Sequence, residues 1–530
     1  MLGCLTDNQV ARGVHVLETT ATGKLVKIPI YAIMFVRGSS GNKNTLFFSC
    51  SVQLCDGSAG NASTCNAPTC TVDFTPDVVV ERRRRAADGD TKVVGRALTV
   101  RFGNATQEEE FMHEEDGYEK EERVRSDVDS LTVEQIQNIR EALQAAKNDE
   151  TISGYNQIAA FHGQPNWCPS PAAEKKYACC THGMAVFPHW HRLLTVQAEN
   201  ALVANGLHGG LPYWDWTLPI TSLPAIVKEE FYTNPKTGES TPNPLYNGLA
   251  DGHPTTRSVR DELFEAPAFG SLTRIAEQVM LAFEQTDFCD FEVQYEIAQN
   301  YIHALVGGNE EYSMASLRFS AYDPIFFLHH SNTDRLWAIW QELQKYRGLP
   351  YNSANCAIAS LRQPLQPFAQ DHVTNPDPVT RDHSTPFDVF NYENSFHYHY
   401  DNLQFNGMSI PQIQREVIKR AAEERVFAGF MLHGIKKSSL VVFEICKPTG
   451  DCKKAGEFYL LGDEYELPWE FDRLFKYEIT DQLSEFGLEP LDMYEVKYEV
   501  FDLARASLGT DIFGVPPQIY LSPYGRAITP

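Results

Sequence analysis

The chain has 530 residues, of which 43% are hydrophobic and 12% aromatic, so it can bury a sizeable core and exceeds the usual size of one domain. Its formal net charge of −25 and pI near 5.1 argue against nucleic acid and anionic membranes as partners. The best apolar run, residues 28–36, is about half the length of a membrane span and contains a proline. We therefore expect a buried strand there and no membrane span.

Residues 1–80 are expected to form a small disulfide-rich β segment, because apolar runs alternate with turn residues and show no helical periodicity. Sequons at Asn61 and Asn104 predict glycosylation. Together with the local spacing of the cysteines, they indicate a secreted, extracellular protein. The first residues have neither a basic start nor an apolar signal region, so we expect a fragment that lacks its true beginning.

Residues 81–123 are expected to be a connecting segment. Four consecutive arginines end at Arg85 and predict cleavage by a furin-type protease, although a solvated basic patch has the same composition. The stretch 107–123 is too charged to fold alone and is typical of a linker.

Helical periodicity dominates residues 124–420. A threonine N-cap and an apolar stripe predict a helix over residues 130–149, and further helices are expected near 192–204, 272–284, 292–305 and 334–346. After about residue 420 the pattern changes to strands, so residues 421–530 are expected to form a separate β domain.

Several histidines of the helical region lie in apolar and aromatic surroundings, where metal ligands are expected. Imidazole is a good ligand for copper, and the candidates are His162, His182, His191, His303 and His330. His189 and His329 are interpreted as structural residues, because each has a better-placed neighbour. The alternative for any single histidine is a core residue bonded to the backbone.

These motifs, in this order, resemble the type 3 copper family: FHG at 161–163, CTHG at 180–183, FPHWHR at 187–192, LPYWDW at 211–216 and DPIFFLHHSNTDRLW at 323–337. Over residues 124–525 the chain resembles molluscan haemocyanin functional units, also in LLGDEYELPWEFDRLFKYEIT and PPQIYLSP. The resemblance implies a multidomain protein with a mainly α-helical, tyrosinase-like di-copper domain followed by a β-sandwich.

Residues 1–80 resemble the C-terminal part of a zona pellucida module in their cysteine spacing and following arginines. This resemblance implies extracellular polymerisation and cleavage after Arg85. A generic disulfide-stapled β segment and a fusion created by faulty gene prediction are the alternatives.

The haemocyanin resemblance also implies a set of site residues. It assigns the first copper to His162, His182 and His191, with a thioether between Cys180 and the ring of His182. The implied disulfides are Cys168–Cys179, Cys289–Cys356 and Cys446–Cys452.

The second copper site departs from the family pattern, in which two ligands lie one turn apart on a helix. His303 and His330 are present, but Gln299 stands where the third imidazole belongs. An amide oxygen is a neutral and harder donor than imidazole, and no nearby histidine is an evident replacement, since His433 and the pair His397 and His399 would need a rearranged fold. We therefore predict that the second copper is weakly held or absent and that reversible dioxygen binding is weakened or lost.

The resemblance implies a dioxygen carrier, used for transport or storage, that binds dioxygen as a peroxide bridging two coppers. Leu460 or Leu461 is the candidate for the leucine that shields the site. The alternatives are a latent oxidase of phenols or catechols, and a secreted structural protein without copper chemistry. A homo-oligomer or a larger multi-unit chain is the expected assembly.

Overall fold

The computed structural model divides the chain into two compact units, Met1–Phe111 and Met112–Pro530. It describes residues 18–19, 26–27, 49–52, 70–73, 123–165, 168, 179–264, 272–352, 361, 364–370, 372–432, 435–463, 473–509, 516–522 and 526–528. None of the described helices is long and apolar enough to cross a membrane.

The first unit contributes two short strand pairs to the described residues. The strands β1 (Glu18–Thr19) and β2 (Val26–Lys27) are antiparallel, as are β3 (Ser49–Val52) and β4 (Cys70–Asp73). The strand expected over residues 28–36, the sequons at Asn61 and Asn104 and the cleavage site at Arg85 lie outside the described residues.

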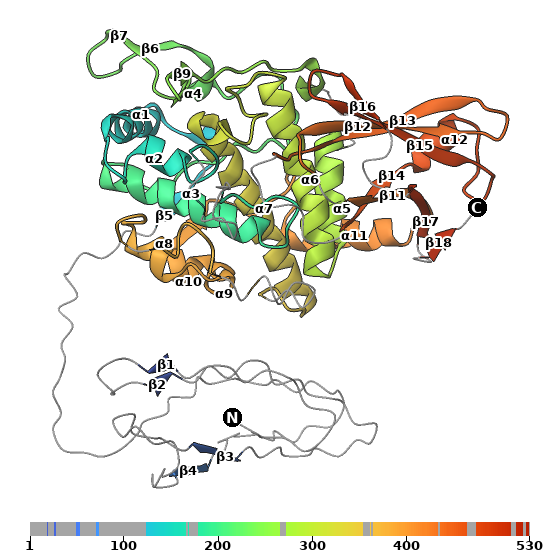
Figure 1. Cartoon of the computed structure of the whole chain (residues 1–530), viewed down its shortest axis with the longest axis horizontal. Helices are drawn as coiled ribbons and strands as arrows, with labels where there is room; N and C mark the ends of the chain where they lie inside the picture. Colours follow the sequence, from blue (N-terminus) through green and yellow to red (C-terminus); the bar gives the residue numbers. More distant parts are fainter. Residues whose placement is uncertain are drawn as a thin grey trace. The chain divides into compact units, whose positions relative to one another are not determined.

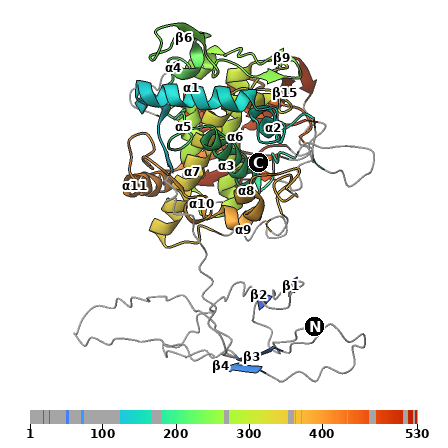
Figure 2. The ribbon, with the colours of Figure 1, turned by 90° about the vertical axis from the view of Figure 1, so that its left-hand side faces the viewer.

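The second unit begins with the helix predicted over residues 130–149, which is confirmed as α1 (Val133–Asn148). Thr132 accepts a hydrogen bond from the backbone N–H of Gln135, whose side chain accepts one from the N–H of Thr132, so a capping box starts the helix. Ile139 and Leu143 lie on its buried face. The helix lies at the end of the helical domain away from the C-terminal strands β11–β18 (Figure 1), and it faces the viewer in Figure 2.

Four longer helices form the centre of the helical domain: α3 (Phe187–Ala204), α5 (Arg274–Glu284), α6 (Phe288–Gly307) and α7 (Ile325–Arg347). Every residue of α6 from Phe291 to Gly307 is buried, including the polar residues Glu292, Gln294, Glu296, Gln299, Asn300 and His303. The helix α3 packs on α7 and α5 packs on α6 (Figure 1).

The predicted start of α7 is too late, whereas α3 begins where Pro188 in the sequence indicates a first helical turn. Pro188 occupies the first turn of α3, where the missing N–H costs nothing, so the helix already contains His191. Asp323 accepts a hydrogen bond from the N–H of Ile325 at 3.2 Å and starts α7 ahead of His329 and His330. Both histidines therefore lie inside the helix rather than before it.

The other elements of the helical domain are short and lie around these helices. The helices are α2 (Tyr155–Ala159), α4 (Ala225–Lys228), α8 (Pro378–Asp382), α9 (Pro386–Val389), α10 (Tyr392–Phe396) and α11 (Ile410–Ala421), with 3-10 turns η1 (Val128–Ser130), η2 (Asp261–Phe264) and η3 (Ser320–Tyr322). The strands pair as β5 (Arg123–Arg125) with β10 (Tyr398–Tyr400), β6 (Phe231–Thr233) with β7 (Ser240–Pro242) and β8 (Leu249–Ala250) with β9 (His253–Pro254).

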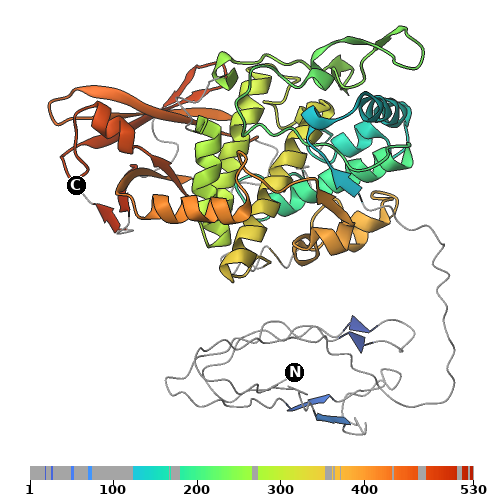
Figure 3. The same ribbon diagram turned by 180° about the vertical axis from the view of Figure 1, so that it is seen from behind.

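The C-terminal part is a sandwich of two antiparallel four-stranded sheets (Figure 3). One sheet has the order β14 (Arg473–Glu478), β11 (Arg425–Leu432), β17 (Gln518–Ser522) and β18 (Arg526–Ile528). The other has the order β13 (Cys452–Leu460), β12 (Ser439–Cys446), β15 (Glu495–Asp502) and β16 (Ser507–Gly509), and α12 (Thr480–Glu485) follows β14.

Aromatic side chains fill the space between the two sheets. The ring of Phe430 lies 5.0 Å from those of Phe443 and Phe458, and Phe458 lies 4.7 Å from Phe475. The predicted disulfide Cys446–Cys452 is confirmed and closes the hairpin of β12 and β13 at two opposite residues.

The sandwich packs on α6 through β13 and β14. It therefore covers one side of the helix that carries Gln299 and His303. Arg425, at the start of β11, forms an ion pair with Glu284 at the end of α5. This contact fixes the start of the sandwich against the helical domain.

Candidate metal centre

Three of the predicted histidines form a compact buried group, here called the first histidine group. His162 follows α2, His182 lies in the loop before α3, and His191 lies in the second turn of α3. All three are at most 3% exposed, and one ring nitrogen of each lies within 4.8 Å of the others. Segments up to 29 residues apart thus bring three imidazoles to one point, as the sequence predicts.

Backbone hydrogen bonds orient two of these rings. Nδ1 of His162 lies 2.9 Å from the carbonyl oxygen of Leu317, and Nδ1 of His191 lies 2.9 Å from that of Phe187. A carbonyl can only accept, so Nδ1 carries the proton and Nε2 keeps its lone pair. Nε2 of both residues is buried and has no hydrogen-bond partner among the described residues. This is the arrangement of a metal-ligating imidazole.

The loop that carries His182 is held from two sides. The predicted disulfide Cys168–Cys179 is confirmed and anchors its start. The N–H of Gly183, which has a φ of 65°, donates to Oε1 of Glu296 on α6 at 2.6 Å. Cys180 is buried two residues before His182, where the resemblance implies the thioether.

Glu296 in turn is held by the sandwich. Arg473 at the start of β14 donates to Oε2 of Glu296 at 2.9 Å and forms an ion pair with Glu292, one turn earlier on α6. Sequence reasoning missed this contact, although two glutamates four residues apart in an apolar, buried helix indicate a shared cationic partner.

A second buried group of histidines lies on α6 and α7 and consists of His303, His329 and His330, here called the second histidine group. One ring nitrogen of each lies within 4.8 Å of the others, and all are at most 1% exposed. Nδ1 of His303 lies 2.7 Å from the carbonyl oxygen of Met314, which leaves Nε2 as the nitrogen with the lone pair. Nε2 of His303 is 3.2 Å from Nε2 of His330.

His329, interpreted from the sequence as a structural residue, lies beside the departed position, where sequence reasoning found no evident replacement for the missing ligand. Nε2 of His329 lies 3.0 Å from Oε1 of Gln299, the residue at the departed position. His397 and His399 lie outside both histidine groups, and His433 lies outside the described residues.

His189 fits its interpretation as a structural residue. It lies outside both histidine groups, and its ring packs against the rings of Trp337 and Phe390 at 4.8 and 4.5 Å.

The two histidine groups face each other. The rings of His191 and His330 are stacked at 4.6 Å with an interplanar angle of 9°. The ring of Phe326, on α7, lies 4.9 Å from His162 and 4.2 Å from His330, and it forms an apolar wall beside both groups. Sequence reasoning did not single out Phe326, although its spacing of four residues from His330 on α7 places both on one face of the helix.

Burial keeps these imidazoles neutral. It lowers the pKa of His162, His191 and His330 well below the ordinary value, and neighbouring histidines lower it further. Burial also lowers the pKa of His303 to about 3. Neutral imidazole is the form that binds a metal, so the site is poised to accept cations without first losing protons.

A buried polar network ties the helices of the two groups together. Asp334, one turn after His330, accepts hydrogen bonds from Arg192, the residue after His191, and from Arg125 on β5. The phenol groups of Tyr398 and Tyr400 donate to the same carboxylate. The relative position of α3 and α7, and thus of the two groups, depends on this network.

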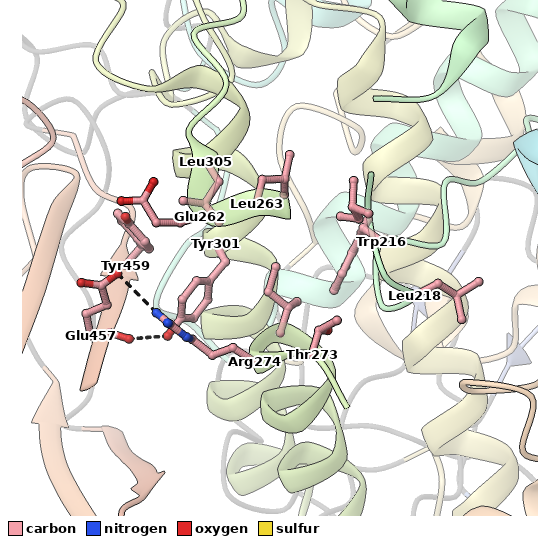
Figure 4. A pocket seen from close by; sticks show the side chains of 12 residues that line it. Trp216, Leu218, Glu262, Leu263, Thr273, Arg274, Tyr301, Leu305, Glu457 and Tyr459 are labelled. Carbon is pink, nitrogen blue, oxygen red and sulfur yellow. Dashed lines mark hydrogen bonds and ion pairs between the residues drawn. The ribbon is translucent and has the colours of Figure 1, made fainter. Parts of the chain in front are cut away.

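Strand β13 covers the outer side of α6. The side chain of Asn300 donates to the carbonyl oxygen of Tyr459 at 3.2 Å, and Leu460 and Leu461 follow with no exposed surface. A cavity of about 20 Å³, with room for roughly one water molecule, lies between this strand, α6 and the Trp216 loop (Figure 4). Tyr301 points into this cavity, and its hydroxyl donates to the carbonyl oxygen of Glu457.

The predicted disulfide of Cys289 is supported in part. Cys289 is disulfide-bonded, and its expected partner, Cys356, lies outside the described residues.

The donor set fits copper. Both groups consist of buried neutral imidazoles, a donor type that suits copper, zinc, iron and nickel, and they lie close enough for a pair of ions. Copper is selected from these metals by comparison with known proteins.

Two family models match the chain. The common central domain of tyrosinase matches residues 152–343, and the haemocyanin beta-sandwich matches residues 420–522. These regions coincide with the helical domain that holds both histidine groups and with the strands β11–β17.

Curated relatives are haemocyanins. Hemocyanin 2 of Megathura crenulata is 60% identical over 402 residues, which are 75% of this chain and 12% of that protein. The Hemocyanin 2-c chain of the same organism is 56% identical over 405 residues, 75% of this chain and 96% of the relative. The chain thus spans a small part of the first of these relatives and nearly all of the second.

Solved structures agree. A functional unit from octopus hemocyanin is 44% identical with a TM-score of 0.70, covering 76% of this chain and all of that unit. A tyrosinase from Burkholderia thailandensis is 16% identical with a TM-score of 0.55, over 76% of this chain and 100% of that enzyme, and shares the fold alone. The predicted resemblance, the predicted fold and copper as the metal are confirmed. From its tyrosinase-type helical domain, its haemocyanin sandwich and a relative that it covers almost from end to end, the chain belongs to the molluscan haemocyanin family.

Proposed function

We propose that this chain is a dioxygen-binding haemocyanin unit that holds a pair of copper ions between its two histidine groups. The observation that carries the proposal is the stacked contact between His191 and His330, which brings the two buried groups face to face. The similarity to haemocyanins at 44–60% identity supports the same function.

The first copper is assigned to His162, His182 and His191, and the second to His303 and His330, with Gln299 at the position of the missing ligand. The backbone contacts of His162, His191 and His303 fix their tautomers with Nε2 available to the metal. The proposed thioether of Cys180 would fix the His182 ring on its loop.

The two cuprous ions, when bound, would supply the two electrons that the binding of dioxygen requires. The chain supplies the conditions for reversibility. Phe326, Leu460 and Leu461 keep water away from the site. The Nδ1 protons of His162, His191 and His303 are held by hydrogen bonds to backbone carbonyls. With no proton to give, the ligands favour release of dioxygen over its conversion to hydrogen peroxide.

Leu460 and Leu461 are proposed to close the site against larger molecules. The bond between Asn300 and Tyr459 places the end of β13 directly on α6, next to Gln299. Closure by these leucines supports a carrier rather than an oxidase of phenols or catechols.

The proposed setting is extracellular, because disulfides form and persist in oxidising compartments and the described residues contain at least two. A multi-unit chain or homo-oligomer is proposed, because this chain covers only 12% of Hemocyanin 2. Glycosylation at Asn61 and Asn104, cleavage after Arg85 and the zona-pellucida-like character of residues 1–80 remain predictions.

The experiment is a dioxygen titration of the purified chain after loading with cuprous ion under anaerobic conditions. We expect one dioxygen per copper pair, taken up in air and released on evacuation, with a matching change in near-ultraviolet absorbance. The control is His208→Asn, which changes an exposed histidine outside both groups. Copper binding without any dioxygen uptake, or no copper binding at all, would refute the proposal.

A further inference from the structure

We propose that His329 replaces the missing third ligand of the second copper, so that His303, His329 and His330 hold this ion and Gln299 acts only as a neighbour. The inference rests on the proposed function, because it concerns the second ion of the proposed pair. It assigns a metal-binding role to a histidine that the family pattern does not use.

The first support is the position of the three rings. One nitrogen of each ring in the second histidine group lies within 4.8 Å of the others, just as in the first group. The ring of His329 lies 4.8 Å from that of His303 and 4.7 Å from that of His330, so the three rings are in mutual contact. The two histidine groups are therefore alike in number and compactness of imidazoles.

The second support is the distance between the nitrogens. With a metal–imidazole distance of about 2.0–2.1 Å, as for zinc, two ligand nitrogens are roughly 3.3–3.6 Å apart. Nε2 of His303 and Nε2 of His330 are 3.2 Å apart, so these two can bind one ion with almost no movement. A ring nitrogen of His329 lies within 4.8 Å of both, so a shift of at most about 1.5 Å brings it to the distance expected between two ligands of one ion.

The third support is the behaviour of Gln299. Its Oε1 faces Nε2 of His329 at 3.0 Å, and its Nε2 donates to Oδ1 of Asn300 at 2.7 Å. Both polar atoms of the amide are thus engaged by neighbours. A neutral amide oxygen is also a poorer ligand for cuprous ion than imidazole. Gln299 therefore orients the replacement ligand instead of binding the metal.

Hydrogen bonds fix the backbone of His329. The carbonyl oxygen of His329 accepts hydrogen bonds from Thr333 Oγ1 at 3.0 Å and from the Trp216 indole at 3.4 Å. Nδ1 of His329 has no hydrogen-bond partner among the described residues, so the contact with Gln299 is the one polar contact of its ring there. Because Oε1 of Gln299 can only accept, Nε2 of His329 carries the proton, and Nδ1 keeps the lone pair that a metal needs.

The experiment measures cuprous ion binding to four forms of the full chain: wild type, His329→Asn, the double variant Gln299→His with His329→Asn, and the control His189→Asn. Cuprous ion is titrated anaerobically against a competing chelator, and copper per chain is counted by metal analysis. The control removes a histidine that is equally buried but lies outside both groups.

We expect two coppers in the wild type and in the control. In His329→Asn the second ion should bind more than about 100-fold more weakly. Loss of a hydrogen-bond partner of a ligand already lowers metal affinity about 10–100-fold, and loss of a ligand itself should lower it more. The double variant should regain two coppers, since it restores the family ligand. This rescue separates loss of a ligand from misfolding, and a crystal structure of copper-loaded wild type should show a ring nitrogen of His329 on the second ion.

Two kinds of result would overturn the inference, and only one of them would also refute the proposed function. Two tightly held coppers in His329→Asn, or a second copper without His329 in the crystal, would refute the role of His329 and leave the proposed function intact. Fewer than two coppers in the wild type would refute both.

Discussion

Replacement of Asp334 by asparagine should destabilise the protein strongly, although the side chain keeps its shape. Asp334 is 3% exposed and faces the guanidinium groups of Arg192 and Arg125. Burial would raise the pKa of Asp334, but the two arginines outweigh burial and hold the pKa below its ordinary value. The carboxylate is therefore ionised at neutral pH, and asparagine would leave the buried guanidinium of Arg192 without a carboxylate, whereas Arg125 keeps its ion pair with Glu199.

The size of the effect follows from the burial of the network. Removal of one partner of a buried ion pair costs about 3–5 kcal/mol. An unfolding entropy of about 2.1 cal/mol/K per residue gives roughly 0.8 kcal/mol/K for a unit of about 400 residues. The midpoint of thermal unfolding should therefore fall by about 4–6 °C.

Differential scanning calorimetry of the copper-free wild type and Asp334→Asn at pH 7 measures this shift. The matched control is Lys236→Gln, which breaks an ion pair with Glu141 whose side chains are 65% and 43% exposed. An exposed pair contributes at most about 1 kcal/mol, so this control should shift by about 1 °C or less. A shift for Asp334→Asn no larger than that of Lys236→Gln would refute the reasoning.

Two further predictions concern the site. Copper-free protein should lose stability as the pH falls below about 6.5, because burial lowers the pKa of His303 to about 3. Between these two pH values the unfolded chain binds a proton that the folded chain does not. His303 alone therefore lowers the free energy of unfolding by about 5 kcal/mol from pH 6.5 to pH 3. Urea unfolding at pH 7, 6 and 5 measures the loss, and a constant midpoint would contradict it. Leu460→Ala should raise the rate of catechol oxidation of the copper-loaded chain by opening the site, whereas Leu483→Ala, an equally buried leucine on α12, should not. Equal rates in both variants would argue against a shielding role for Leu460.

Much of the fold could be predicted because its signals are local. The threonine cap of α1, the alternating strands after residue 420 and the family motifs each depend on residues close in the chain. The start of α7 was harder to predict, because it depends on how Asp323 satisfies the first turn.

Most of the histidines of the site could be predicted from their motifs. The compact first group and the pair His303 and His330 follow from the motifs and are brought together as expected. The position of the His329 ring in the second histidine group did not follow, because adjacent residues on a helix normally point about 100° apart. The tertiary contacts of this ring with Gln299 and His303 show its position, and they cannot be read from the sequence.

The ion pairs of Arg473 mean that the sandwich cannot be treated as a removable lid. Arg473 is the counter-charge for Glu292 and Glu296, two buried carboxylates on the helix that also carries His303. A truncated chain without β14 would leave both buried carboxylates of α6 without a counter-charge. The helical domain would be destabilised by their burial and by the repulsion between them. Glu296 would also lose the support that keeps it on the Gly183 amide beside His182. Trimming the protein to its helices would thus disturb both halves of the centre instead of exposing an intact one.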